Sequence, residues 1–143
     1  MAKVSITMTT GSWEPNINNK RESLSINHAD LAHFINLSRE EQLSSIESHL
    51  SETQLQVFPG LIERSIQQWQ AAAENLSQDE IWHLIRFWTV AEKISGWECA
   101  EKSPVIALNK LLKKRKQPLS KDQLLWIKAQ SDNHFLPNGP LLM

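Results

Sequence analysis

Cysteine, glycine and tyrosine are scarce in this chain, and each shortage narrows what the protein can be. Cys99 is the only cysteine among 143 residues, so no intramolecular disulfide can form. The four glycines argue against a sheet with many tight turns and against a glycine-rich phosphate loop. Tyrosine is absent, and the aromatic residues are six tryptophans and four phenylalanines. These counts favour a fold with few tight turns.

Long apolar runs are also missing. No stretch approaches the ~20 consecutive apolar residues that a membrane-spanning helix needs. No apolar run of signal-peptide length follows Lys3. A single cysteine is typical of a reducing compartment. We therefore expect a cytoplasmic protein.

Length and composition predict one domain that is preceded by an arm and followed by a tail. Hydrophobic residues make up 41% of the chain and charged residues 22%, which is ordinary for a globular domain. Residues 1–24 are polar and are broken by Gly11 and Pro15, so we expect an extended arm there, with Trp13 as a possible anchor. Residues 25–131 form the expected helical domain, and residues 132–143 an irregular, apolar tail.

Helix-start signals recur along residues 25–131. A Ser, Thr, Asp or Asn followed three residues later by an acid or glutamine is typical of an N-terminal cap, and so is a proline at the first helical position. We find such signals at Asn27, Ser38, Phe58-Pro59-Gly60, Ser77, Ser103-Pro104 and Ser120. Together they predict an all-α fold, a single compact bundle of five or six helices.

Apolar residues spaced by three and four predict two central helices, over 59–76 and 78–95. Gly96 follows the second, where a left-handed C-terminal cap is expected. We expect short connections at 51–58, 96–103 and 117–120, and short connections favour antiparallel neighbours.

Charge is sorted along the chain. Residues 102–128 carry eight cations against one acid, Asp122, a net charge of +7. Residues 39–101 carry four cations against eleven acids, a net charge of −7. This separation predicts either docking on a charged partner or pairing between the two parts of the same chain.

The favoured interpretation is a non-enzymatic interaction module, a small adaptor or regulator that docks an acidic protein partner. The basic segment would attract the partner, and an exposed tryptophan would provide a buried anchor. Trp97 is either such an anchor or a lid folded back over the core. The apolar tail either packs on the bundle or joins a partner or a second copy in a homodimer. The expected partner-binding residues are Trp97, Lys110, Lys113, Lys114, Arg115, Lys116, Lys121 and Trp126.

A nucleic-acid-binding protein is the first alternative. The basic segment has the outline of two helices joined by a short turn, its cations could neutralise phosphates, and Trp126 could stack on an unpaired base. The overall pI of about 6.5 argues against this alternative.

A metal-dependent helical enzyme is the second alternative. Asp30 with His33, and Glu80 with His83, have the spacing that places two metal ligands on one helix face. Glu80 is also a capping residue, which argues against a metal site, and we expect no metal or other cofactor. The acids next to Cys99 should raise the pKa of its thiol, which argues against a catalytic cysteine.

Overall fold

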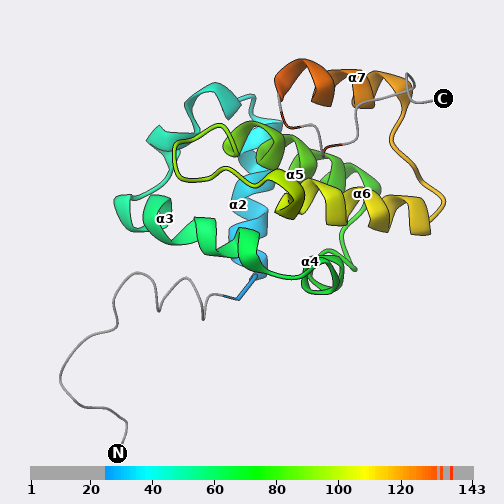
Figure 1. Ribbon diagram of the computed structural model, residues 1–143, viewed down its shortest axis with the longest axis horizontal. Helices are drawn as coiled ribbons and strands as arrows, with labels where there is room; N and C mark the ends of the chain where they lie inside the picture. Colours follow the sequence, from blue (N-terminus) through cyan, green and yellow to red (C-terminus); the bar gives the residue numbers. More distant parts are fainter. Residues whose placement is uncertain (1–24, 132, 134–135, 137–143) are drawn as a thin grey trace, which may run out of the picture.

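The computed structural model describes residues 25–131, 133 and 136, and within them it is helical with no strand. The predicted all-α class is therefore confirmed. The expected arm at 1–24 with Trp13, and most of the tail, lie outside the described residues. In Figure 1 the elements follow in the order α2 (His28–Arg39), η1 (Leu43–His49), α3 (Glu52–Val57), η2 (Phe58–Glu63), α4 (Ile66–Ala72), α5 (Gln78–Ala91), η3 (Ala100–Lys102), α6 (Pro104–Lys114) and α7 (Lys121–Gln130), where η denotes a 3₁₀ helix.

Four of the predicted helix starts have the expected geometry. The Ser77 hydroxyl accepts from the Glu80 N–H, and the Glu80 carboxylate accepts from the Ser77 N–H. Ser120 forms the same capping box at the start of α7. Ser103 caps α6, which has Pro104 in its first turn, and Asn27 caps α2. These side chains satisfy backbone N–H groups that have no partner within the helix.

The predicted start at Ser38 is wrong. Ser38 lies in the last turn of α2, fully buried, and its hydroxyl is paired with the His83 ring instead of a backbone N–H. Glu41, the expected second member of the capping box, has a positive φ of 56° just beyond the helix. The apolar face of α2 extends to Leu37, so tertiary packing continues the helix through the serine.

The single helix expected over 59–76 is also wrong, because the chain breaks at Arg64 (φ −74°, ψ 147°). The first part is η2 and the second is α4. Ser65 and Gln68 form a capping box at this break, and Ser51 and Gln54 form another at the start of α3, inside the expected connection 51–58. Both Ser-x-x-Gln signals can be read in the sequence.

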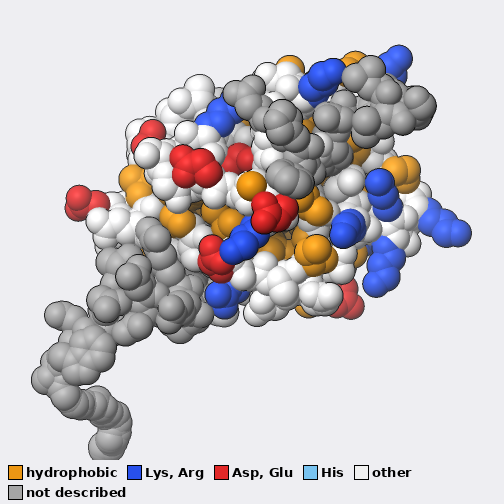
Figure 2. All heavy atoms as spheres, in the orientation of Figure 1, with side chains coloured by type: hydrophobic (Ala, Val, Ile, Leu, Met, Phe, Trp, Pro, Cys, Tyr) orange, Lys and Arg blue, Asp and Glu red, His pale blue; other side chains and the backbone are white. Residues whose placement is uncertain are grey.

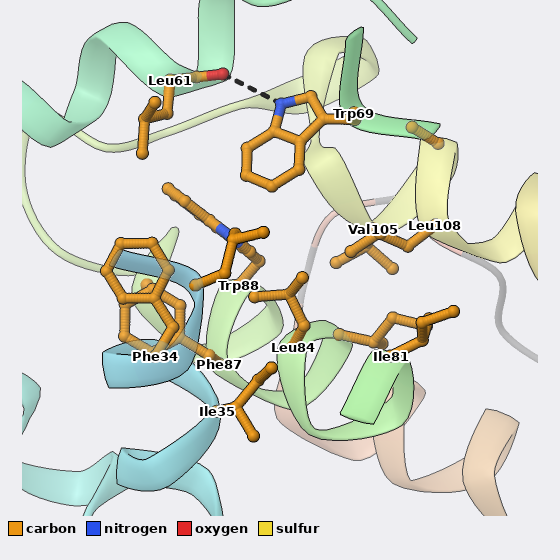
Figure 3. Packing of buried hydrophobic residues seen from close by; sticks show 14 of the residues in the cluster. Phe34, Ile35, Leu61, Trp69, Ile81, Leu84, Phe87, Trp88, Val105 and Leu108 are labelled. Carbon is orange, nitrogen blue, oxygen red and sulfur yellow. Dashed lines mark hydrogen bonds between the residues drawn. The ribbon is translucent and has the colours of Figure 1, made fainter. Parts of the chain in front are cut away.

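The helix α5 is central, as its broad apolar surface predicts, although it ends at Ala91 and not at residue 95. The helices α2, α6 and α7 all pack against it, and α4 packs against α6. Figure 3 shows Phe34 of α2 on one side of the α5 side chains, and Val105 and Leu108 of α6 on the other. The rings of Phe34 and Phe87 are stacked with centroids 4.2 Å apart. This packing gives one continuous core.

The chain after α5 turns at Gly96, which has the predicted left-handed conformation (φ 90°). The helix has already ended, with Glu92 as its C-cap, so Gly96 belongs to the turn that follows. The backbone N–H of Gly96 donates to the Glu98 carboxylate at 3.1 Å. Glycine suits this position because side chains rarely adopt such a φ value.

The described part of the tail packs against the body of the protein. Leu136 is buried in the common core. The Asn133 amide donates to the buried Glu92 carboxylate at 2.9 Å and to the Ala100 carbonyl at 3.0 Å. Ser103 donates to the same carboxylate at 3.2 Å. At Asn133 and Leu136, then, the contacts are made within the chain. Among the described helices, none has the length and apolarity required to cross a bilayer.

Candidate functional site

The candidate docking surface is a group of exposed lysines on α6, on α7 and on the turn between them. We call this group the basic end, and its members are Lys110, Lys113, Lys114, Lys116, Lys121 and Lys128. The first three are spaced by three and one along α6, on the face opposite its buried leucines. Figure 2 shows Lys and Arg side chains gathered at the right, over the end of α6.

None of these lysines forms an ion pair within the described residues. The four ion pairs found there join Arg39 to Asp79, His83 to Asp79, Arg86 to Glu41, and Lys102 to Glu63. Among the described residues, pairing between the acidic part (39–101) and the basic part (102–128) therefore involves only Lys102 of the basic part. The charge of the basic end is directed to solvent, where it can attract an acidic surface.

Arg115 differs from its lysine neighbours, because its guanidinium is directed inward. It donates to the carbonyl oxygens of Leu76 at 2.8 Å and Ala73 at 3.2 Å, and it also contacts the Glu74 carbonyl. These carbonyls follow the end of α4, so Arg115 acts as a C-terminal cap from a different helix. Its expected role as a partner-binding residue is not supported by this position.

Trp97 lies in the core and not at the surface. The residue is 1% exposed, and its indole N–H donates to the Leu55 carbonyl at 3.1 Å. The ring also lies close to Trp88, with centroids 5.7 Å apart. Of the two alternatives for Trp97, the lid over the core describes its position, and the exposed anchor is wrong. The polar residues on both sides of Trp97 gave no sign of this burial.

Trp126 is half-buried where α7 packs against α5. Its ring meets the Trp82 ring edge-on at 5.6 Å, and the Arg86 guanidinium lies 5.0 Å from its centroid. An aromatic pair and a cation–π contact of this kind stabilise helix packing. Trp126 therefore attaches α7 to the body, which leaves less of its ring for a partner.

Leu125 is an exposed apolar residue that the sequence prediction missed. The residue is 43% exposed, and Ile66 is the only other large hydrophobic residue exposed to a similar degree among the described residues. Lys121 lies four residues before Leu125 and Lys128 three residues after, so all three share one face of α7. The spacing of these three residues is visible in the sequence.

The two Asp/Glu–His pairs do not come together as a metal site. Glu80 caps α5, Asp30 accepts from the Asn27 amide, and the His33 ring contacts the His49 carbonyl at 3.1 Å. His83 faces Ser38. In the part of the chain that the structure describes, no group of three or more His, Cys, Asp or Glu residues is arranged to hold a metal ion.

A row of three polar side chains has the outline of a catalytic triad, and its members are Ser38, His83 and Asp79. The Ser38 hydroxyl is 2.8 Å from Nδ1 of His83, and Nε2 of His83 is 3.7 Å from the Asp79 carboxylate. Ser38 is fully buried, however, so a substrate cannot reach its hydroxyl. The carboxylate of Asp79 is also closer to Arg39, at 2.9 Å. We therefore interpret the row as a polar link between α2 and α5.

Burial dominates the titration behaviour of His83 and Cys99. Burial lowers the pKa of His83 below 6.5, and the Asp79 carboxylate opposes this shift. Burial also raises the pKa of the Cys99 thiol, and the negative charges of Glu92 and Glu98 add to the increase. The expected direction for Cys99 is thus confirmed, although its neighbouring acids are the smaller cause. A thiol of this kind is a poor nucleophile at neutral pH.

Comparison with known proteins gives no relative: no family model, no curated protein and no solved structure matches this chain. Function therefore has to be inferred from the geometry and charge of its own surfaces.

Proposed function

We propose that this protein is a non-enzymatic interaction module, a small cytoplasmic adaptor or regulator, that docks an acidic protein partner through the basic end. One observation carries the proposal: six exposed lysines have no carboxylate partner among the described residues. Unpaired charges of one sign speed association with an oppositely charged surface.

Leu125 replaces Trp97 as the proposed apolar anchor. It projects between Lys121 and Lys128 on the exposed face of α7. An apolar side chain between cations suits a partner whose surface has an apolar patch with acidic residues around it. Burial of the apolar side chain at the centre of the interface would contribute most of the affinity. The rim lysines then contribute mainly to the association rate and to its salt dependence.

Charge reversal tests this proposal. The variant Lys113→Glu/Lys114→Glu/Lys116→Glu inverts the charge, and Lys113→Arg/Lys114→Arg/Lys116→Arg is its matched control with the charge kept. Proteins captured by the unaltered chain should be lost by the first variant and retained by the second. An acidic protein identified in this way should also bind Leu125→Asp more weakly. Equal capture by all the variants would refute the proposal.

Nucleic-acid binding through the same lysines is the alternative proposal. A phosphate-driven complex weakens steeply between low and moderate salt, because binding releases counterions. Retention of a single-stranded and a duplex oligonucleotide, measured across that salt range, separates the alternatives. Steep, salt-dependent retention that is lost in the glutamate variant would favour nucleic acid over an acidic protein. The edge-on contact of Trp126 with Trp82 argues against stacking on a base.

A further inference from the structure

A second surface feature is a hollow between two helix junctions. One side is formed where η2 meets α4, and the other where η3 meets α6. The hollow has a volume of about 290 Å³. Figure 2 shows apolar side chains near the centre of this face, with acidic and basic side chains around them. Pockets for drug-sized ligands begin at roughly 300 Å³, so this one suits a smaller molecule.

One wall of the hollow is apolar. Ile62 and Trp69 line it and are buried, and Ile66 lines it and is 37% exposed. The indole N–H of Trp69 already donates to the Leu61 carbonyl at 3.0 Å, so the ring offers only apolar surface. Covering Ile66 with an aliphatic chain would remove apolar surface from water, which is favourable.

Arg64 supplies a cation without a partner. It is half-buried at the break between η2 and α4, and it lines the same hollow. Its Nε atom is inaccessible to solvent and has no hydrogen-bond partner, one of three such side-chain atoms among the described residues. No ion pair with Arg64 is found there either. No hydrogen bond from the outer N–H groups of the guanidinium is found among the described residues, and an anion in the hollow could pair with those groups.

The remaining charges favour a ligand with both signs. Lys102 pairs with Glu63 at 3.0 Å, so these two charges balance each other. Glu101 also lines the hollow and has no ion pair among the described residues. The four charged side chains of the hollow therefore sum to zero, so a phosphate or another multiply charged anion would gain no net attraction there. A carboxylate with a nearby ammonium group would match Arg64 and Glu101 together.

We propose that this hollow binds a free aliphatic α-amino acid of about the size of leucine. The carboxylate of the ligand pairs with Arg64, its ammonium group faces Glu101, and its side chain covers the apolar wall at Ile62 and Ile66. The proposal is independent of the basic end, because none of its residues belongs to that surface.

Calorimetric titration with L-leucine tests the site. Two probes each lack one charged group of leucine: 4-methylpentanoate lacks the ammonium group, and 3-methylbutylamine lacks the carboxylate. Leucine should bind saturably, and each probe should bind about tenfold more weakly, since each loses a charged hydrogen bond. Arg64→Gln should weaken leucine binding by a similar factor. The matched control is Lys93→Gln, which removes an exposed cation at a different hollow and should leave binding unchanged.

A second variant guards against a folding defect in Arg64→Gln. Ile66→Asp places an acid in the first turn of α4, which favours the helix. The same change removes the apolar contact between Ile66 and the ligand side chain, and the new carboxylate repels the carboxylate of the ligand. Circular dichroism confirms the fold of each variant. Binding lost in both Arg64→Gln and Ile66→Asp supports the site. Absence of saturable leucine binding to the unaltered protein, or unchanged binding to folded Arg64→Gln, overturns it. Equal affinity for 4-methylpentanoate and leucine overturns the role of Glu101.

Discussion

Replacing Arg115 should cost stability, whereas replacing its lysine neighbours should not. The Arg115 guanidinium donates to three backbone carbonyls beyond the end of α4, and two of these hydrogen bonds are partly buried. Lys113 and Lys114 on the same helix end are exposed and have no such contacts. The prediction thus separates a structural cation from the cations of the docking surface.

The magnitude follows from these contacts. A hydrogen bond contributes about 1 kcal/mol net, so two partly buried bonds and one exposed bond give about 2 kcal/mol for Arg115→Ala. For a domain of this size, that corresponds to a decrease in Tm of about 6 °C. Arg115→Lys should recover less than half of the loss, because a single ammonium group cannot span all three carbonyls.

Urea denaturation followed by tryptophan fluorescence measures the free energy of unfolding for each variant. Lys114→Ala is the control and should change it by no more than about 0.5 kcal/mol. Amide hydrogen exchange in α4 should accelerate in Arg115→Ala and not in the control. If Arg115→Ala and Lys114→Ala unfold at the same urea concentration, Arg115 does not cap α4 and the reasoning is refuted.

Three further predictions concern single side chains. Arg64→Met keeps the apolar stem of the side chain and removes the unpaired Nε atom. The free energy of unfolding, measured in urea, should therefore rise by about 1 kcal/mol. A decrease would contradict the energetic cost assigned to the Nε atom. Burial raises the pKa of Glu92 above 4.5, so the native state binds this proton more tightly than the unfolded state does. The contribution of Glu92 to the free energy of unfolding therefore falls as pH rises above 4.5. Glu92→Gln should therefore gain stability relative to the unaltered protein over that range in urea titrations at several pH values, and a constant difference would exclude this linkage. Ser65→Ala should lower the unfolding free energy by about 1 kcal/mol through loss of the α4 cap, while Ser44→Ala in the exposed part of η1 should change it little.

Helix starts were the most predictable part of the fold. Ser77, Ser103 and Ser120 cap helices where the sequence indicates. Each cap joins a side chain to a backbone N–H two or three residues away, so it depends on local geometry alone. Ser65 carries the same local signal, and it begins α4 inside the range 59–76 where the apolar spacing predicts one continuous helix.

The candidate docking surface was predictable only in part. The exposed lysines follow from their spacing against the buried leucines of α6. The roles of Trp97 and Arg115 do not, because their partners, Leu55 and the carbonyls of residues 73, 74 and 76, lie about 40 residues away in the chain. No periodicity identifies a contact at that separation.

The sequence by itself determined the all-helical class, most of the helix starts, the central place of α5 and the separation of charge. All of these depend on neighbours within one or two turns of helix. The tertiary structure alone decided that Ser38 links two helices, that Trp97 is buried, that Arg115 caps α4 and that Arg64 lines a hollow without a partner. The physical reason is that burial and long-range hydrogen bonds depend on which helices pack together, and that choice is made by the whole core.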